Sequence, residues 1–298
     1  MSPFVLRRGV AEDVASVTEL LAAEERAVRG ESRWSEADTR DWFHDLSVGG
    51  EVWIAEDDGR RLGVAGVFLG EVARSWISVD PSSAEPEIGR ALVETVEERA
   101  KERGAAKLTV LSFAENSSAA RLLARAGFRD DRHFYRMEIE LSERPPEPDW
   151  PDGISCTTFA AGDARAFHAA VNEALADDYG HHPVSFDEWK RMRLEAPGFD
   201  PSLWFVARDG EEIAGICRCT AERWGCGWIE ALGVRRPWRR RGVGSALLRH
   251  AFRELYDRGA RCVGLGVDTQ NPSGATRIYE RAGMRVVVEN ILFEKALT

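Results

Sequence analysis

The stretch Arg235-Arg-Pro-Trp-Arg-Arg-Arg-Gly-Val-Gly-Ser-Ala-Leu-Leu248 decides the fold of this chain and suggests what it binds. Five arginines and two glycines, Gly242 and Gly244, lie between a strand pattern and a helix pattern. Such a turn presents backbone N–H groups, a helix N-terminus and guanidinium groups to one anion. It favours a site for a phosphate-bearing cofactor over a solvated basic turn or a nucleic-acid patch.

The segments around this turn alternate between strand and helix patterns. A hairpin is predicted from residues 204–207 and 213–216, which flank Asp209-Gly210. A strand over residues 228–234 leads into the turn, and the helix after it stops at Gly259. A strand over residues 262–267 and a short helix through Tyr279 follow. This mixed order predicts an α/β architecture with helices packed on a sheet.

The two halves of the chain are weakly self-similar. Residues 89–92 (Gly-Arg-Ala-Leu) match residues 244–247 (Gly-Ser-Ala-Leu), and Asn116 matches Asn271, both at an offset of 155. A Pro-rich stretch, residues 143–151, reads as an extended linker. We therefore predict a first domain over residues 1–143, a linker over 144–151 and a second domain over 152–298.

Each predicted domain begins with two helices. The first of them covers residues 11–25 in one half and 161–176 in the other. A capping signal opens the second helix in each half, with Ser35 three residues before Asp38 and Ser185 three residues before Glu188.

Composition narrows the class of protein. The chain has 298 residues and a formal net charge of −10, which disfavours a general nucleic-acid binder. No apolar run has the length of a membrane span, and the N-terminus lacks the apolar core of a signal peptide, so a cytoplasmic location without membrane association is expected. We expect reduced, mostly buried thiols and no metal site for the cysteines, which are Cys156, Cys217, Cys219, Cys226 and Cys262.

Two sequence patterns in the second half, spaced as in a known enzyme family, indicate a resemblance to that family. Arg239-Arg-Arg-Gly242-Val-Gly244 resembles the acyl-CoA-binding pattern Arg/Gln-x-x-Gly-x-Gly/Ala of the GCN5-related N-acetyltransferases. Asn271, Tyr279 and Gly283-Met284 resemble the later motif of that family. The resemblance covers the second half well and the first half in outline, and the whole chain is similar in layout to the tandem acetyltransferase mycothiol synthase.

The resemblance implies two tandem domains of this family, each a mixed, mostly antiparallel sheet flanked by helices. It implies acetyl-CoA as cofactor and direct transfer of an acetyl group to the amine of a small molecule. It also implies that the strand before the turn splays from its neighbour, and that the pantetheine arm pairs with the exposed backbone. A free N–H there could polarise the thioester carbonyl.

The residues expected to bind the cofactor come mainly from this strand and turn. Their roles are backbone pairing with the arm, N–H and guanidinium contacts to the pyrophosphate, and for Asn271 either contact with the arm or capping of the short helix. The three arginines cannot all point inward. The set is Leu232, Gly233, Val234, Arg239, Arg240, Arg241, Gly242, Val243, Gly244, Ser245 and Asn271.

Acetyl transfer to an amine needs a proton acceptor and a proton donor. Tyr279 is the candidate acid, because a phenol is protonated at neutral pH and can donate to the leaving thiolate. Glu230 is the candidate base, and its alternative is a surface or substrate-binding carboxylate. The loop over residues 177–183 is expected near the acceptor, where acidic groups would favour a cationic amine. Its residues could instead be turn and cap residues, or His181 or His182 could serve as the base.

The first half lacks the counterparts of these residues. At the same offset, residues 239–242 correspond to 84–87 (Ala-Glu-Pro-Glu), Glu230 corresponds to Ser75, and Tyr279 corresponds to Leu123 after a one-residue insertion. A carboxylate beside a phosphate is repulsive, and proline lacks an N–H donor. We therefore predict one active site per chain, in the C-terminal half.

Three alternatives stay open for the function. The acceptor could be the amine of a thiol sugar, as for mycothiol synthase. The chain could instead sense acyl-CoA without turnover, or bind nucleic acid through the arginine turn. The sequence specifies neither the acceptor nor the oligomeric state.

Overall fold

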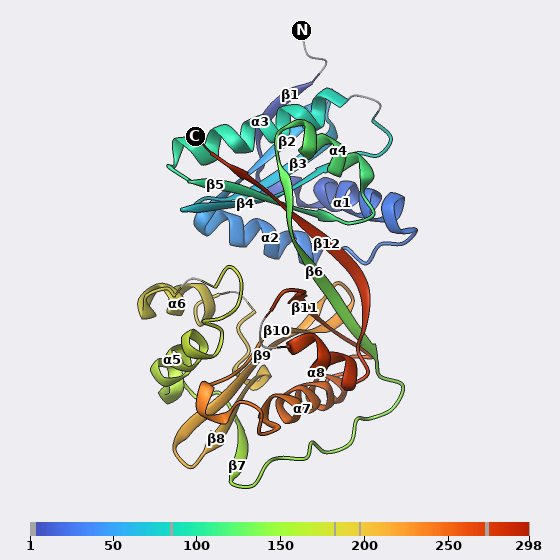
Figure 1. The fold of residues 1–298 in the computed structure, drawn as a ribbon. Helices are drawn as coiled ribbons and strands as arrows, with labels where there is room; N and C mark the ends of the chain where they lie inside the picture. Colours follow the sequence, from blue (N-terminus) through green and yellow to red (C-terminus); the bar gives the residue numbers. More distant parts are fainter. Residues whose placement is uncertain (1–3, 84–85, 182, 197, 272–273, 298) are drawn as a thin grey trace. The chain divides into compact units, whose positions relative to one another are not determined.

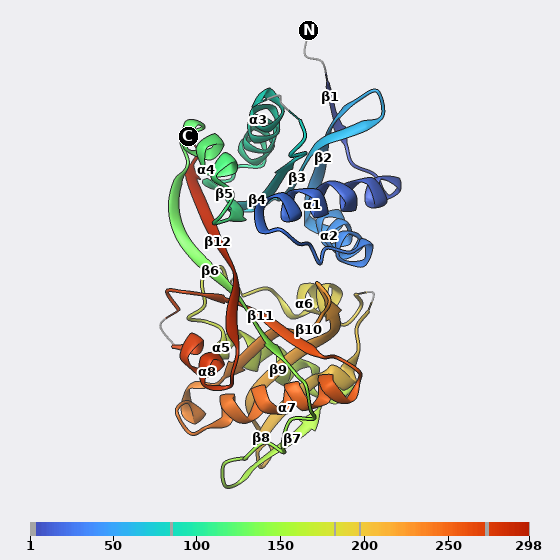
Figure 2. The same ribbon diagram turned by 90° about the vertical axis from the view of Figure 1, so that its right-hand side faces the viewer.

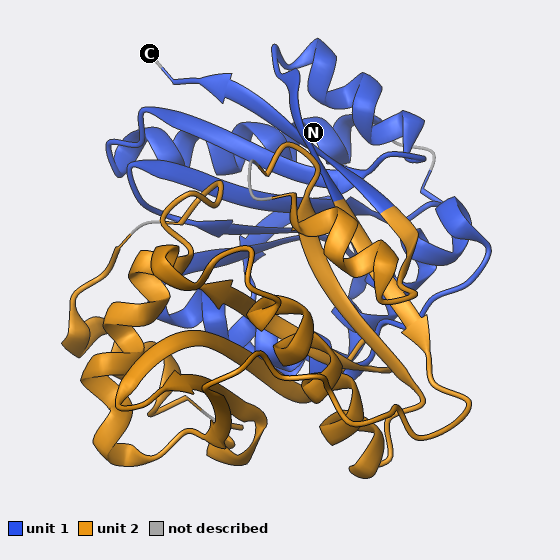
Figure 3. Cartoon of the chain, turned by 60° about the horizontal axis from the view of Figure 1, so that its bottom comes forward, with its two compact units in different colours: residues 1–134, 289–298 blue, residues 135–288 orange. Residues whose placement is uncertain are grey.

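The computed structural model describes residues 4–83, 86–181, 183–196, 198–271 and 274–297 (Figure 1). The chain forms two compact units (Figure 3). Unit 1 comprises residues 1–134 and 289–298, and unit 2 comprises residues 135–288. The division therefore lies at residues 134/135 and 288/289, and not at the Pro-rich segment.

The elements up to the end of the sixth strand are β1 (Val5–Arg8), α1 (Val14–Arg29), α2 (Glu36–Gly49), β2 (Gly50–Asp57), β3 (Arg60–Phe68), β4 (Val72–Val79), α3 (Pro86–Glu102), β5 (Lys107–Phe113), α4 (Ser117–Arg125) and β6 (Arg129–Glu140). The remaining elements are β7 (Ile154–Thr158), α5 (Ala164–Ala174), α6 (Phe186–Arg193), β8 (Trp204–Asp209), β9 (Glu212–Arg223), β10 (Cys226–Val234), α7 (Val243–Asp257), β11 (Cys262–Asp268), α8 (Ala275–Arg281) and β12 (Arg285–Ala296).

The strand β12 explains why unit 1 is not continuous in sequence. It pairs antiparallel with β5, from Asn290 opposite Phe113 to Ala296 opposite Lys107. The last residues of the chain therefore complete the sheet of unit 1. The Pro-rich segment is irregular, as expected of a linker, but it belongs to unit 2, where Arg144 forms an ion pair with Asp257 of α7.

Each unit contains a mixed, mostly antiparallel sheet, as the resemblance implies. The strand order is β1-β2-β3-β4-β5-β12 in unit 1 and β6-β11-β10-β9-β8-β7 in unit 2. The pairs β4–β5 and β10–β11 are parallel. The pairs β1–β2, β2–β3, β3–β4, β7–β8, β8–β9 and β9–β10 are antiparallel.

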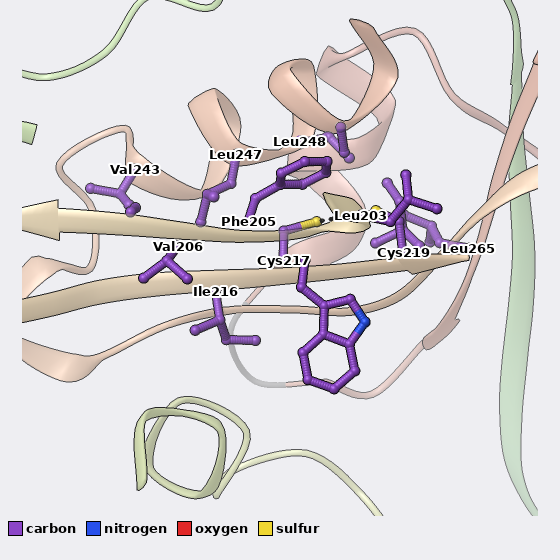
Figure 4. Packing of buried hydrophobic residues seen from close by; sticks show 14 of the residues in the cluster. Leu203, Phe205, Val206, Ile216, Cys217, Cys219, Val243, Leu247, Leu248 and Leu265 are labelled. Atoms are coloured by element: carbon purple, nitrogen blue, oxygen red, sulfur yellow. Dashed lines mark hydrogen bonds between the residues drawn. The ribbon is translucent and has the colours of Figure 1, made fainter. Parts of the chain in front are cut away.

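Helices cover both faces of each sheet. In unit 1, α1 and α2 lie on one face and α3 and α4 on the other (Figure 2). In unit 2, α7 packs on one face of β8 and β9, while α5 packs on the other. Figure 4 shows Phe205, Leu247 and Leu248 between the sheet and α7, whereas Ile216 points to the opposite face. The alternation along these strands therefore assigns each side chain to one helical layer.

The predicted local signals are present. Ser35 and Ser185 are the N-cap residues of α2 and α6, and their hydroxyls accept from the backbone N–H of Asp38 and Glu188. The Asp209-Gly210 turn joins β8 to β9. In the described part of the chain, no helix has the length and apolar character that a membrane span requires.

The expectation of five reduced cysteines is wrong. Cys226 and Cys262 form a disulfide between the first residues of β10 and β11. Parallel pairing of these strands brings the two Cα atoms to 4.7 Å, within the range that a disulfide spans. Their ligand atoms also lie near the carboxylate of Glu138, but a disulfide has no thiolate to offer a metal. The cysteines at 156, 217 and 219 are free thiols.

Candidate functional site

The strand β10 separates from β11 after Ile229, within unit 2. The parallel pairing joins Gly227 to Val263, Trp228 to Gly264 and Ile229 to Leu265. From there to Val234, β10 has no pairing partner on that edge among the described residues. On its other edge, β10 stays paired with β9 through Val234. The splayed strand that the resemblance implies is therefore present. Because β9 pairs with the backbone groups of alternate residues, the groups of Leu232 and Val234 point to the splayed edge, where the Val234 carbonyl accepts from Arg239.

A β-bulge at Glu230 marks the point of separation. Ile229 lies opposite Cys219, and the next pair joins Ala231 to Arg218, so β10 contributes one extra residue there. A bulge increases the local twist and re-aims the side chain it carries. The bulge thus starts the splay and sets the direction of the Glu230 carboxylate.

The turn after β10 has two glycines in the family pattern, Gly242 and Gly244, and only the first of these positions requires glycine. Gly242 is the N-cap residue of α7 and has a left-handed backbone, with φ of 90°. Gly244 does not have a positive φ, and an added Cβ there would meet Val234 at 3.4 Å, an ordinary contact. The pattern Gly-x-Gly/Ala therefore follows from geometry, because the first position needs glycine and the second accepts alanine.

The three arginines of the turn have different environments. Arg239 donates to the backbone carbonyl of Val234 and forms an ion pair with Asp177 at 2.8 Å. Arg241 lies 3.7 Å from the carboxylate of Asp209. Arg240 is exposed, has a φ of 62°, and makes no ion pair or hydrogen bond within the described residues. Arg239 therefore braces the turn against α5, and Arg240 is the guanidinium available to a ligand.

The end of α5 lies over Gly233 of β10, which is buried. An added Cβ on Gly233 would lie 2.8 Å from the Cβ of Ala174, so this approach excludes a side chain. Leu232 and Val234 are partly buried, and they pack against the hydrophobic core under α7. The N-terminus of α7 follows with Val243 and Gly244 buried and Ser245 exposed.

Glu230 is the extra residue of the bulge and is partly exposed. Its carboxylate contacts the guanidinium of Arg223 at 3.2 Å. The ion pair holds the carboxylate in one orientation next to the splayed edge of β10. This position is compatible with proton acceptance and also with binding of a cationic substrate.

Tyr279 of α8 is buried, with 7% of its surface exposed. Burial raises its pKa above the usual value of a phenol, and the nearby Cys217 and Asp178 raise it further. No hydrogen bond from its hydroxyl is present within the described residues. The phenol is therefore protonated at neutral pH and has a proton free to donate.

Asn271 links the loop before α8 to the loop after α5. Its Nδ2 donates to the carboxylate of Asp178 at 2.8 Å. The N-cap residue of α8 is Gly274, so Asn271 does not hold the N-cap position. Burial raises the pKa of Asp178 above its usual value, while the hydrogen bond from Asn271 lowers it. Sequence reasoning named the loop but missed Asp178, because nothing in the sequence distinguishes it from Asp177.

The acceptor loop is only partly described. Asp177 forms ion pairs with Arg236 and Arg239, so it fastens the loop to the arginine turn. The backbone N–H of His181 donates to the carbonyl of Asp178. His182 lies outside the described residues. Among the described residues of the loop, Asp178 is the one whose charge acts on the pKa of Tyr279.

Unit 1 lacks the bulge and the early separation of strands. Its β3–β4 pairing is regular from Gly63 opposite Val79 to Phe68 opposite Arg74. The parallel β4–β5 pairing continues through Trp76, which corresponds to Ala231 in unit 2. The counterparts of the candidate catalytic residues are structural, since Ser75 donates to a backbone carbonyl and Leu123 is in the core. Residues 84 and 85 lie outside the described part of the chain.

A buried carboxylate occupies the region of unit 1 that corresponds to the splayed edge. Glu24 of α1 accepts hydrogen bonds from Ser78, the counterpart of Gly233, and from Asn116, the counterpart of Asn271. Burial raises the pKa of Glu24 to about 7, against the lowering effect of these two hydrogen bonds. Unit 1 therefore fills this region with its own side chains.

The raised pKa of Glu24 predicts a pH-dependent stability. The folded state binds its proton more tightly than the unfolded chain, so stability falls as pH rises from 4.5 to about 7. We expect Glu24→Gln to remove this loss, giving a stability gain over the wild type that grows to about 3 kcal/mol across that window. Urea unfolding at several pH values measures it. The exposed Glu98→Gln is the control, and a gain independent of pH would contradict the assignment.

Two family models match the chain, one in each half. The "Acetyltransferase (GNAT) family" matches residues 167–284, and the "Acetyltransferase (GNAT) domain" matches residues 48–130. The first match covers the bulge, the arginine turn and Tyr279.

Curated relatives extend over most of the chain. The mycothiol acetyltransferase of Geodermatophilus obscurus is 30% identical over 286 residues, covering 91% of this chain and 90% of the relative. That of Kineococcus radiotolerans is 32% identical over 242 residues, covering 77% and 76%.

Solved structures have the same tandem arrangement. A GCN5-related N-acetyltransferase from Sphaerobacter thermophilus has a TM-score of 0.87 and 34% identity, and covers 100% of this chain and 96% of its own. A tandem GNAT protein from the clavulanic acid biosynthesis pathway has a TM-score of 0.77 at 16% identity, and covers 99% of both chains. At that identity, the second likeness supports the fold alone.

Proposed function

Because this chain belongs to the GCN5-related N-acetyltransferase family, we propose that it transfers an acetyl group from acetyl-CoA to the amine of a small molecule, at one site in unit 2. The observation that carries the proposal is the bulge at Glu230 with the splayed β10 edge, followed directly by the Gly242 turn. Unit 1 has the family's fold without the bulge, and its strands β4 and β5 part only after Trp76, so we propose that it is non-catalytic.

The residues present fit the phosphates and the arm of the cofactor. Arg240 supplies a guanidinium, and the backbone from Arg241 to Ser245 supplies N–H donors at the start of α7. The splayed edge of β10, where the backbone groups of Leu232 and Val234 point away from β9, would pair with the pantetheine arm, and Gly233 would lie between them. We propose that Asn271 lines the arm while Asp178 holds its amide in place.

The chemistry proposed for the site is direct attack of the amine on the thioester that acetyl-CoA supplies. Tyr279 holds a proton at neutral pH and donates it to the leaving sulfur. A backbone N–H of the splayed edge stabilises negative charge on the carbonyl oxygen. Glu230 accepts the proton of the amine, directly or through a water.

Asp178 is the alternative base. Its raised pKa places it nearer to neutrality than an ordinary aspartate, and it is close to Tyr279. Glu230 is preferred here because the bulge orients its side chain at the point where the strands part. The pH profile of kcat/KM in Glu230→Gln and Asp178→Asn separates the two, since loss of the base removes the acidic limb.

A second candidate acceptor follows from the relatives. The matching curated proteins are named mycothiol acetyltransferases, and their likeness extends over 91% of this chain in one case. A thiol-sugar amine is therefore a candidate substrate beside other small amines. Sensing of acyl-CoA without turnover is less favoured, because Tyr279 has a proton available near Cys217, the cross-strand partner of Leu232.

The proposal predicts one cofactor site per chain and release of free coenzyme A with an amine. Calorimetry on the full chain should give about one molecule of acetyl-CoA per chain. A panel of amines, followed by detection of the free thiol, should identify at least one acceptor. A stoichiometry of two would contradict the single site, and binding without release of thiol for any amine would favour the sensing alternative. The full chain is needed, because residues 1–150 alone lack β12.

A further inference from the structure

Arg218 of β9 lies beside the proposed acetyl-transfer point. It is the cross-strand partner of Ala231, the first residue after the bulge. Side chains alternate between faces along a strand, so Arg218 shares a face with Ile216 and not with Cys217. That face is opposite to the α7 layer (Figure 4). Arg218 therefore points to the side of the sheet that α5 covers.

The guanidinium of Arg218 lies over an aromatic ring on this side. Its Cζ lies 5.5 Å from the ring centroid of Trp204. The Trp204 ring in turn contacts Phe167 of α5 at 5.2 Å and Trp189 of α6 at 6.1 Å. The guanidinium thus lies against an apolar wall beneath the two helices that precede β8.

The charge of Arg218 has no anionic partner at ion-pair distance within the described residues. Its Nε is buried and makes no hydrogen bond there. Burial lowers the pKa of Arg218 to about 10, the neighbouring Arg193 and Arg223 lower it too, and Glu230 raises it. The group is still protonated at neutral pH. Two cations and one carboxylate thus act on Arg218, and that carboxylate, Glu230, already contacts Arg223.

We propose that the acceptor amine carries an anionic group, a carboxylate or a phosphate, and that Arg218 binds it. Buried cations are normally paired, and the planar guanidinium matches the oxygens of either anion. Because Arg218 lies opposite Ala231, the anion would be held close to the amine that attacks at the adjacent strand edge. This inference rests on the proposed function, and it disfavours a neutral thiol sugar as acceptor.

Matched pairs of amines test the proposal by binding. The probes are phenylalanine against phenylalaninamide, and glucosamine 6-phosphate against glucosamine, titrated calorimetrically into the full chain saturated with coenzyme A. We expect the anionic member of at least one pair to bind about tenfold tighter or more, the value of a charge-assisted hydrogen bond. The first pair reports a carboxylate and the second a phosphate.

Substitution of Arg218 should abolish that preference. In Arg218→Gln the affinity of the anionic amine divided by that of its neutral partner should fall to about one, while the affinity for acetyl-CoA stays unchanged. Arg249→Gln, an exposed position on α7, should keep the wild-type ratio. Arg218→Lys keeps the charge but loses the planar fork, so it should retain part of the preference and covers the case in which Arg218→Gln does not fold.

The outcomes separate this inference from the proposed function. Equal affinities within both pairs, a preference that persists in Arg218→Gln, or binding by none of the four probes would overturn the role of Arg218. If the neutral amine of each pair is acetylated with the same kcat/KM as its anionic partner, the anionic acceptor is rejected and the N-acetyltransferase activity remains in place. Anion-dependent binding without release of thiol would instead retain the Arg218 site and contradict catalysis.

Discussion

Replacing Tyr279 with phenylalanine should lower kcat about a hundredfold or more while the affinity for acetyl-CoA changes little. The variant removes the hydroxyl and keeps the ring, which is buried in the core of unit 2. Burial also raises the pKa of the phenol, so the wild-type group is protonated throughout the physiological range. The loss of rate should therefore persist across neutral pH.

Tyr256→Phe is the matched control. Tyr256 lies on α7, and its ring faces the guanidinium of Arg261 at 4.2 Å, away from the proposed chemistry. Its kcat should equal that of the wild type. Steady-state kinetics with an acceptor from the amine panel, together with calorimetric titration of acetyl-CoA, give both quantities. An unchanged kcat in Tyr279→Phe would exclude the phenol as the proton donor.

The parts of the site that the sequence predicts are those set by local backbone chemistry. Gly242 could be placed because a turn entering a helix needs a residue with positive φ, and the structure gives it φ of 90°. The N-caps Ser35 and Ser185 were predictable for the same reason, since a cap involves residues three positions apart. The family pattern of Asn271 and Tyr279 then located the second half of the site.

The parts that the sequence does not predict depend on strand register and long-range pairing. Whether Glu230 is an ordinary strand residue or a bulged one depends on how β10 meets β9. The disulfide joins residues 36 positions apart, through a parallel pairing that no local signal reveals. The pairing of β12 with β5 is likewise non-local, so the Pro-rich segment was an insufficient guide to the boundary between units.

Charged groups covered by the packed layers are also not predictable from the sequence. Glu24 and Arg218 read as surface residues of an amphipathic helix and a strand, because their burial depends on the layers packed over them. Both have shifted pKa values, raised for Glu24 and lowered for Arg218, and desolvation is the largest cause in each case. The two groups differ in their partners. In unit 1 the Glu24 carboxyl accepts hydrogen bonds from Ser78 and Asn116, whereas in unit 2 we propose that the Arg218 guanidinium binds an anionic ligand.

Replacing Gly242 in the turn of unit 2 by the residue at the corresponding position of unit 1 should abolish tight binding of acetyl-CoA. The counterpart of Gly242 is Glu87, so the variant is Gly242→Glu. A left-handed backbone costs a non-glycine residue about 1–2 kcal/mol. A carboxylate about 4 Å from a phosphate charge adds roughly 4 kcal/mol at an effective dielectric of 20. Together they predict a loss of about three decades or more in affinity for acetyl-CoA.

Two further variants separate strain from charge. Gly242→Ala adds the strain alone and should weaken binding by about one decade. Gly244→Ala adds a Cβ that meets Val234 at an ordinary 3.4 Å, so its affinity should equal that of the wild type. Calorimetry at two salt concentrations extends the test, because salt screens the charge contribution and leaves the strain. Equal losses in Gly242→Glu and Gly242→Ala would show that no phosphate lies at this turn, and the proposed cofactor site would then be wrong.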